Sequence, residues 1–498
     1  MTTPELSESQ RPSGAVLLGF VSACAAVVAA VLLGVDAAHP LSDGLFCWGS
    51  LAVAAVGLVA ALRFVPLWLR SLPVGIVGAV ALLAFAAAVV DATDAEHSAA
   101  YLTAALAAGL AVQAGALESA ASVVVGPREW PRYGMVVVLA VLVLASGVWL
   151  ALKGASSSTY DVALAVALGV APAPLAVAVL APLAIGAARA RRRGVVIRHT
   201  SAAARSAGVR SLVLDGIGTL VAGKHVASVD PLDETHLRNL RWFAGALAHA
   251  GEDPMSRAIA RLAVRGNLTD VAQSASMGLS GNVDRHPVRL ADPEVVGLEP
   301  ADVTLVPGHT VGVEVDLRPL GTIRVEDTVR AGASDAVATL VSAGIEPVLI
   351  SAATGPTASA IMGETGVNHL VERTATPSGH DVTRALGLCK DPAPTAAAVV
   401  SPRPPDSSEV FHLGPDSDVF SLDEASIEHA ALALGLGRAI WSVTRRARTI
   451  AIAGQGLVTL AALAGVLPPW GAAIGAGVVS GLLWGIVALA LPGRGEDG

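Results

Sequence analysis

The sequence predicts a bundle of about eight membrane-spanning helices joined to a polar segment, which contains a doubly wound parallel α/β sheet with an α+β insertion. Three observations carry this prediction. Of the 498 residues, 53% are hydrophobic and only 15% are charged, whereas soluble proteins carry about 25% charged residues. Apolar stretches long enough to cross a bilayer recur before the polar segment and return after it. Within the polar segment, short β-rich runs alternate with helical stretches, the order typical of a parallel sheet.

Composition also limits the possible partners and sites. The net charge of −8 gives no reason to expect a nucleic acid partner. The three cysteines, Cys24, Cys47 and Cys389, lie far apart and form no CxxC pair. Neither a disulfide framework nor a thiolate metal site is therefore predicted. The histidines of the polar segment share no zinc-ligand spacing.

Eight apolar runs approach the length of about 20 residues that a spanning helix needs. Lysine and arginine fall almost entirely in alternate loops, and the run from Arg189 to Arg193 follows the sixth span. By the positive-inside rule, both termini and the polar segment are expected in the cytoplasm, as in a multi-pass plasma (inner) membrane protein whose arginine run contacts anionic lipid. The runs are 14–35, 44–62, 71–90, 99–117, 134–152, 163–188, 449–467 and 471–491.

The predicted spans hold almost no ionisable groups, which ion pathways usually require. Gln113 and Gln455 are their notable polar side chains, and each is expected to make an interhelical hydrogen bond. The sixth span contains Pro174 and Pro182. Because a proline frees backbone carbonyls and bends a membrane helix, a kink is predicted at Pro174. No Cys, Asp, Ser or His lies beside it.

The polar segment opens with a short apolar run, Leu212 to Leu214, that predicts a buried strand ending at Asp215. A glycine-rich turn and Thr219 follow. Open α/β sheets place their chemistry at the carboxyl ends of parallel strands, where an aspartate can attack a phosphoryl group. The alternative is a strand that simply stops at a turn, because Asp and Gly are ordinary turn residues.

Further strands are predicted at 348–351, which ends at Ser351, and at 396–400, with a helical stretch at 357–363 between them. An insertion between about 221 and 325 is interpreted as a second subdomain. Its predicted elements are strands at 303–306 and 311–317 and an amphipathic helix over about 242–264.

In this order, the residues resemble the heavy-metal-transporting P-type ATPase family over nearly the whole chain. Eight spans with a large cytoplasmic loop after the sixth are the first part of the resemblance. Pro174 and Pro182 match the two prolines of the family's sixth-helix motif, CPCALGLATP. The phosphorylation loop, DKTGTL, is matched by Asp215, Gly218, Thr219 and Leu220.

The insertion and the strand that leaves it carry weaker matches to the same family. Pro254 falls on the His-Pro motif of the family's nucleotide domain, and 278–281 resembles part of its glycine motif. The stretch 321–330 (GTIRVEDTVR) is close to the family pattern GxIxxxDxxR. Each match is modest, and their order and spacing carry the resemblance.

The resemblance implies four regions: a six-helix transmembrane region (1–193), a haloacid-dehalogenase-like phosphorylation domain (194–220 and 322–440), a nucleotide-binding-like insertion (221–321) and a C-terminal transmembrane hairpin (441–498). It also implies ATP and Mg²⁺ as cofactors. The residues that it singles out are the catalytic Asp215, Thr219 and Ser351, the nucleotide-binding Gly278, Gly281 and Pro254, the Mg²⁺ ligands Asp215 and Asp406, and Pro174 in the transport helix.

The chain departs from the family where the family carries charge. Gly216 replaces the lysine that steadies the transferring phosphate, and in the stretch 401–406 (SPRPPD) only Asp406 remains of the two GDGxND aspartates. Lys224 and Asp406 are candidate substitutes. The other replacements are Ala353 for the TGD aspartate, His380 for a later lysine, Asp253 for the His-Pro histidine, and Ala173 and Leu175 for the metal-binding cysteines.

The family's actuator domain has no counterpart either, since only a short stretch around 118–132 separates the fourth and fifth predicted spans. Phosphoryl transfer depends on neutralising negative charge with Mg²⁺ and a lysine. The leading hypothesis is therefore a catalytically degenerate relative that acts as a membrane scaffold or regulatory pseudo-pump. It would work with another membrane protein or with a chain that supplies an actuator.

Two other hypotheses stay open. The first is a working cation-transporting ATPase with divergent motifs, which holds Mg²⁺ mainly through Asp215 and Asp406. The second is a membrane-anchored haloacid-dehalogenase-like phosphatase. That superfamily protonates its leaving group with a second aspartate, and Ile217 stands at that position.

Overall fold

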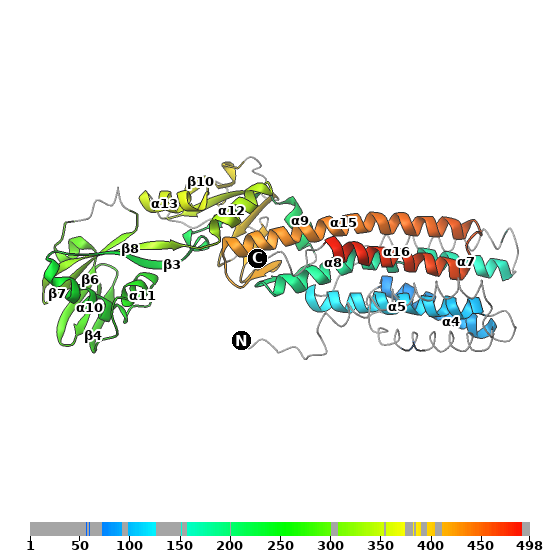
Figure 1. Cartoon of the computed structure of the whole chain (residues 1–498), viewed down its shortest axis with the longest axis horizontal. Helices are drawn as coiled ribbons and strands as arrows, with labels where there is room; N and C mark the ends of the chain where they lie inside the picture. The colour runs from blue at the N-terminus through cyan, green and yellow to red at the C-terminus, as the bar shows by residue number, and fades with distance from the viewer. Residues whose placement is uncertain are drawn as a thin grey trace. The chain divides into compact units, whose positions relative to one another are not determined.

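The computed structural model of the protein describes residues 56, 59, 72–91, 98–125, 151, 157–199, 201–299, 307–352, 355–373, 382, 385–389, 396–403 and 411–490. These residues divide into two compact units. The first unit takes the described residues of 1–207 and 434–498, and the second takes those of 208–433. Figure 1 shows long helices in the first unit and two β-sheets in the second.

The first unit is a bundle of apolar helices with a core of small residues. Gly454 on α15 (Ile427–Leu463) and Gly475 on α16 (Pro469–Ala490) allow these two helices to pack closely. A methyl group added at Gly454 would lie 2.7 Å from the Val479 side chain, and one added at Gly475 would lie 2.8 Å from the Val458 side chain. Small residues at such contacts are typical of helix packing in lipid. The elements are α4 (Leu72–Asp91), α5 (Ser98–Val125), α7 (Ser157–Val170), α8 (Ala173–Arg191), β1 (Val195–Ile197), α9 (Ala202–Gly208), α15 (Ile427–Leu463) and α16 (Pro469–Ala490).

Four of the predicted spans coincide with helices. The runs at 71–90, 99–117 and 471–491 correspond to α4, α5 and α16, and most of the run at 449–467 lies in the second half of α15. Among the described residues, two helical stretches are long and apolar enough to cross a membrane: Tyr160–Arg191, which runs through α7 and α8, and Pro469–Ala490, which is α16. The runs at 14–35, 44–62 and 134–152 lie almost wholly outside the described residues, so the count of eight spans stays a prediction.

The sixth predicted span consists of two helices, α7 and α8, with an interruption at Ala171 and Pro172. Pro174 lies in the first turn of α8, where a proline is tolerated because its missing N–H would have no helical partner. The Gln455 side chain on α15 donates a hydrogen bond to the Ala171 carbonyl oxygen at this interruption. The interhelical hydrogen bond expected of Gln455 is therefore present. The same carbonyl oxygen also accepts from the Ala173 N–H at 2.9 Å, so Gln455 is its second donor.

In the second unit, six strands form a parallel sheet in the order β13-β12-β11-β2-β9-β10. Both central strands are apolar because both of their faces are buried: Val213 on β2 and Val348 on β9 are fully buried in the core. The elements are β2 (Ser211–Asp215), η2 (Ile217–Thr219), α12 (Ala333–Ser342), β9 (Glu346–Ser351), α13 (Pro356–Thr365), β10 (His369–Glu372), β11 (Ala397–Val400), β12 (Phe411–Gly414) and β13 (Phe420–Leu422).

The insertion is an antiparallel sheet in the order β3-β8-β7-β6-β5-β4, with α10 and α11 packed against it (Figure 1). Leu240 and Leu247 on α10 and Ile259 on α11 are buried with Val313 and Ile323 of the sheet. The elements are β3 (Val221–Pro231), η3 (Glu234–His236), α10 (Leu237–Ala248), α11 (Pro254–Ala260), β4 (Leu268–Ser274), β5 (Gly278–Val283), β6 (His286–Ala291), η4 (Pro293–Val296), β7 (His309–Val315) and β8 (Arg318–Val329).

Two sequence predictions for the insertion need correction. The single helix predicted over 242–264 is two helices, because α10 ends at Ala248 and Asp253 caps a new helix at Pro254. The strand predicted at 311–317 ends at Val315, because Asp316 and Leu317 form a turn with φ angles of 51° and 62°. The strand predicted at 303–306 lies outside the described residues.

Replacing Gln455 by Leu should destabilise the bundle, because the Ala171 carbonyl oxygen then loses this donor in an apolar environment. Interhelical hydrogen bonds in membranes contribute about 0.6–1.7 kcal/mol, so the free energy of unfolding should fall by about that amount. Thermal unfolding in detergent micelles measures it. Leu457→Ala is the control, because Leu457 lies on the same helix and is 70% exposed. Equal stability of both variants would contradict the prediction.

Candidate functional site

The site lies at the carboxyl edge of the parallel sheet, where β2 ends at Asp215. Strand β2 is flanked by β9 and β11, and Asp215 is in register with Ile350. The Gly216 N–H donates a hydrogen bond to the Ile350 carbonyl oxygen (2.8 Å). Asp215 is thus fixed at the edge where open α/β sheets carry their chemistry, as the sequence predicts.

The turn after Asp215 has a backbone that only glycine adopts readily. Gly216 has φ 94° and ψ 153°, a region that is costly for residues with a side chain. The Thr219 hydroxyl donates to the Gly216 carbonyl oxygen at 2.8 Å, and Thr219 is fully buried. Thr219 therefore stabilises the turn. A lysine at position 216 would strain it.

Sequence reasoning missed Arg373, which directly follows β10. Its guanidinium Nη2 contacts Asp215 Oδ1 in an ion pair, and the Arg373 and Asp215 side chains are 30% and 32% exposed. The Arg373 N–H donates to the Ser351 carbonyl oxygen (2.8 Å), which anchors the arginine beside the end of β9. Ser351 itself is buried. The structure therefore places Asp215 in contact with a cation from its own chain.

The described residues do not fit a Mg²⁺ ion at this edge. Mg²⁺ in phosphoryl-transfer sites is usually held by one or two carboxylates together with substrate phosphates. Asp215 already has a cationic partner, and within the described ranges no group of three His, Cys, Asp or Glu residues could hold a metal. Lys224, a candidate substitute for the missing lysine, pairs instead with Asp327 at 2.7 Å. Asp406, Ala353 and His380 lie outside the described residues.

The two glycines assigned to nucleotide binding are explained by packing. Gly278 has φ 72°, and a methyl group added there would lie 2.1 Å from the Leu290 carbonyl oxygen. A methyl group added at Gly281 would lie 3.1 Å from the Leu247 side chain and 3.2 Å from that of Val271. Gly278 therefore requires a residue without a side chain, and a side chain at Gly281 would be crowded, whether or not a ligand is bound.

Pro254 is the first residue of α11, and Asp253 before it caps the helix. The Asp253 carboxylate accepts from the N–H groups of Met255 (2.9 Å) and Ser256 (3.0 Å) and from the Ser256 hydroxyl (2.5 Å). Burial raises the pKa of Asp253, but the hydrogen bonds from Ser256 and Met255 outweigh it, and the pKa is below its ordinary value. The aspartate that replaces the family's histidine thus has a structural role as a helix cap.

Curated relatives of this chain are metal-transporting ATPases. A copper-exporting P-type ATPase of Legionella pneumophila is 27% identical over 271 residues, which cover 51% of this chain and 36% of the relative. A copper-exporting P-type ATPase of Mycobacterium tuberculosis is 28% identical over 254 residues (48% and 33%). A zinc/cadmium/lead-transporting P-type ATPase of Escherichia coli is 27% identical over 321 residues (59% and 43%). The chain matches between about a third and two fifths of the length of these relatives.

Solved structures show the same fold. One crystal structure of a zinc-transporting PIB-type ATPase has a TM-score of 0.59 at 18% identity, over 95% of this chain and 100% of the other. A second crystal structure of a zinc-transporting PIB-type ATPase has a TM-score of 0.54 at 21% identity, over 77% and 67%. No family model matches the chain.

Replacing Asp253 by Ala should loosen α11, because the N–H groups of Met255 and Ser256 lose their acceptor. Loss of such a cap costs about 1 kcal/mol, so amide hydrogen exchange over 254–260 should accelerate about fivefold near neutral pH. Glu252→Ala removes a neighbouring exposed charge and is the control.

The same experiment has a defined pH dependence. The pKa of Asp253 is lowered in the folded state, so its stabilising effect is complete above the unfolded-state value of about 3.9 and is lost as the pH falls through the lower folded-state value. The difference between Asp253→Ala and the unmodified chain should therefore shrink in acid. Equal exchange in Asp253→Ala and Glu252→Ala near neutral pH would refute the capping role.

Proposed function

We propose that this chain is a catalytically silent relative of the heavy-metal-transporting P-type ATPases, to which it is related. It would act as a membrane scaffold or regulatory pseudo-pump. A membrane location is supported by this relationship and by the two long apolar helical stretches. We further propose that the chain crosses the membrane several times, with the second unit and both termini on the cytoplasmic side.

The contact between Arg373 and Asp215 carries this proposal. A phosphoryl acceptor must present a free carboxylate oxygen to the phosphorus atom. In Asp215, Oδ1 is held by a guanidinium that also neutralises the carboxylate charge and so lowers its nucleophilicity. Asp215 is therefore held in a resting ion pair.

The backbone at Gly216 supports the same proposal. Phosphoryl transfer depends on cations that neutralise the oxygens of the transferring group, and in this family one of them is the lysine expected at 216. The φ of 94° disfavours every residue with a side chain at this position. Removing one such electrostatic donor commonly lowers the rate by about 10²–10³. The site thus departs from the family in backbone as well as in side chains.

Chain length gives a third line of support. Only residues 126–156 lie between α5 and α7, too few for the actuator domain of roughly a hundred residues that the family carries in this region. A phosphorylated Asp215 would therefore lack its hydrolysing loop within this stretch. We propose that the chain works with another membrane protein. A partner that supplies an actuator domain would provide the missing hydrolysing loop and so restore a cycle of phosphorylation and hydrolysis.

The two other hypotheses have less support. An active cation pump would need Asp215 released from Arg373 and a second Mg²⁺ ligand such as Asp406. A haloacid-dehalogenase-like phosphatase would need a general acid where Ile217 stands. No described contact favours that activity.

The full-length chain, purified in detergent or lipid discs, should form no acid-stable phosphoenzyme from ATP and Mg²⁺. Its ATP hydrolysis should equal that of Asp215→Asn, because Asp215 does not act as a nucleophile. Radiolabelled ATP followed by acid quenching and gel electrophoresis measures the first quantity, and phosphate release measures the second.

The Legionella pneumophila relative, treated in parallel, is the positive control for both assays. Phosphoenzyme that forms in the unmodified chain and disappears in Asp215→Asn would overturn the proposal in favour of an active ATPase. Hydrolysis of small phosphate esters that depends on Asp215 would overturn it in favour of a phosphatase.

A further inference from the structure

A hollow lies at the amino edge of the parallel sheet, at the end of β2 opposite to Asp215. It has a volume of about 540 Å³ and is formed where β2, β9 and β10 begin and where α12 ends. This volume is within the range of about 300–1,000 Å³ that small-molecule sites occupy. The lining includes Arg210, Val341, Gly344, Glu346, Asn368 and His369.

The backbone of Arg210 is fixed at this edge by hydrogen bonds on both sides. Its N–H donates to the Ala396 carbonyl oxygen (2.7 Å), and its carbonyl oxygen accepts from the Glu346 N–H (2.8 Å). Arg210 is exposed, and among the described residues it forms no ion pair. Guanidinium groups bind carboxylates through paired hydrogen bonds. A guanidinium on a fixed backbone without a carboxylate partner can therefore bind an anionic ligand at a low cost in entropy.

Glu346 and His369 carry the other charged groups of the lining and contact each other. His369 Nε2 lies 3.1 Å from Glu346 Oε1, and the two side chains are 34% and 27% exposed. Glu346 is in register with Ser211. Because side chains alternate along a strand, Glu346 shares a face of the sheet with Ser211 and not with Arg210. Its carboxylate therefore leaves Arg210 unneutralised, and it would repel a second negative charge on a ligand in the same hollow.

The rest of the lining is apolar or lacks a side chain. Val341, in the last turn of α12, is 53% exposed, and Pro347 is buried. Gly344 has φ 72°, and a methyl group added there would meet no atom within 4 Å, so the space beside the turn is open. A ligand that covers Val341 would remove apolar surface from water. The exposed amide of Asn368 adds a hydrogen-bond donor to this lining.

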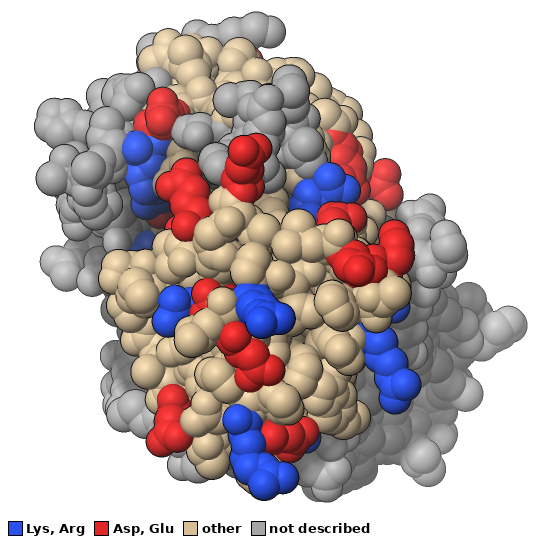
Figure 2. Space-filling model, turned by 90° about the vertical axis from the view of Figure 1, so that its left-hand side faces the viewer, with Lys and Arg blue, Asp and Glu red and all other residues tan. Residues whose placement is uncertain are grey.

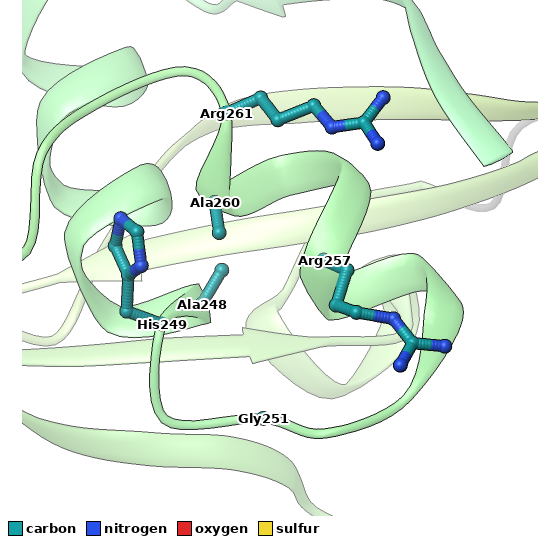
Figure 3. Close-up of a pocket in the computed structure, with 6 residues that line it drawn as sticks. All are labelled: Ala248, His249, Gly251, Arg257, Ala260 and Arg261. Carbon is teal, nitrogen blue, oxygen red and sulfur yellow. The ribbon is translucent and has the colours of Figure 1, made fainter. Parts of the chain in front are cut away.

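Charges elsewhere in the second unit are arranged differently. Figure 2 shows basic and acidic side chains interspersed over the end of the molecule that faces the viewer. In a hollow beside α11, Figure 3 shows the guanidinium groups of Arg257 and Arg261 pointing apart. These two arginines therefore do not converge on one ligand. The hollow at the amino edge instead combines one guanidinium with an apolar wall.

From these observations we propose that the hollow at the amino edge binds a small monocarboxylate with an apolar body. Arg210 and Asn368 hold the carboxylate, and Val341 contacts the apolar part. Glu346 disfavours ligands that carry a second negative charge. The inference goes beyond the proposed function, because it does not depend on whether Asp215 is phosphorylated. A simple carboxylic acid and an amino acid share this chemistry, and the experiment distinguishes them.

Isothermal titration calorimetry of the full-length chain in lipid discs tests the proposal, with empty discs as the blank. The probes have the same carbon chain length: hexanoate, the neutral hexanol, the dianion adipate and the amino acid norleucine. Hexanoate should bind about tenfold more tightly than hexanol or adipate, because only hexanoate offers a single carboxylate to Arg210. If norleucine binds at least as tightly as hexanoate, the ligand is an amino acid; if it binds more weakly, the ligand is a simple carboxylic acid.

Two variants with matched controls make the result specific to the hollow. Arg210→Gln should weaken hexanoate binding about tenfold, the loss expected when one charged hydrogen-bonding partner is removed. Arg403→Gln is its control, because Arg403 is exposed and follows β11 at the opposite edge of the same sheet. Val341→Asp places a carboxylate in the hollow and should abolish binding. Val264→Asp, at a position of the insertion that is 71% exposed, is the matched control and should bind normally.

Three results would each overturn the proposal. The first is no binding of hexanoate at millimolar concentration. The second is hexanol or adipate binding as tightly as hexanoate. The third is equal hexanoate binding by Arg210→Gln and Arg403→Gln, or by Val341→Asp and Val264→Asp.

Discussion

The ion pair between Asp215 and Arg373 depends on the order of the strands in the parallel sheet. Strand β9 lies between β2 and β10, so Asp215 and Arg373 leave the sheet at the same carboxyl edge although 158 residues separate them. Both side chains are about a third exposed, and such pairs contribute only about 0–1 kcal/mol to stability. The consequence of the pair is therefore chemical: it gives the carboxylate a cationic partner from its own chain, where a phosphoryl-transfer site would bring one in with its substrate.

Local sequence patterns predicted the central strands well and the ion pair not at all. The strand at 212–214 is β2 (Ser211–Asp215), and that at 348–351 is β9 (Glu346–Ser351), because fully buried strands are continuous apolar runs. Strand β10 has only four residues and contributes little periodicity. Arg373 could be placed beside Asp215 only once the strand order was known, and strand order is a non-local property.

The break between α10 and α11 was a different kind of error, since its signal is local. Asp253 followed by Pro254 is a common start of a helix, with a capping carboxylate and a proline at the first helical position. The amphipathic pattern continues across the break because both helices cover the same sheet. Hydrophobic periodicity alone therefore merged two helices, and the capping residues would have separated them.

The positions that keep the family's residues differ physically from those that lose them. Gly278 is required by the backbone, because a methyl group added there would lie 2.1 Å from the Leu290 carbonyl oxygen, and Thr219 is buried and donates a hydrogen bond within the turn after β2. A charged group at an open edge is not required for folding, because partly exposed charges contribute little to stability. In the helix bundle, Ala173, which stands where the family carries a cysteine, is buried by apolar packing on α8. A fold of this kind can therefore persist after its catalytic charges are replaced, and structural likeness to a pump is weak grounds for assigning it the activity of one.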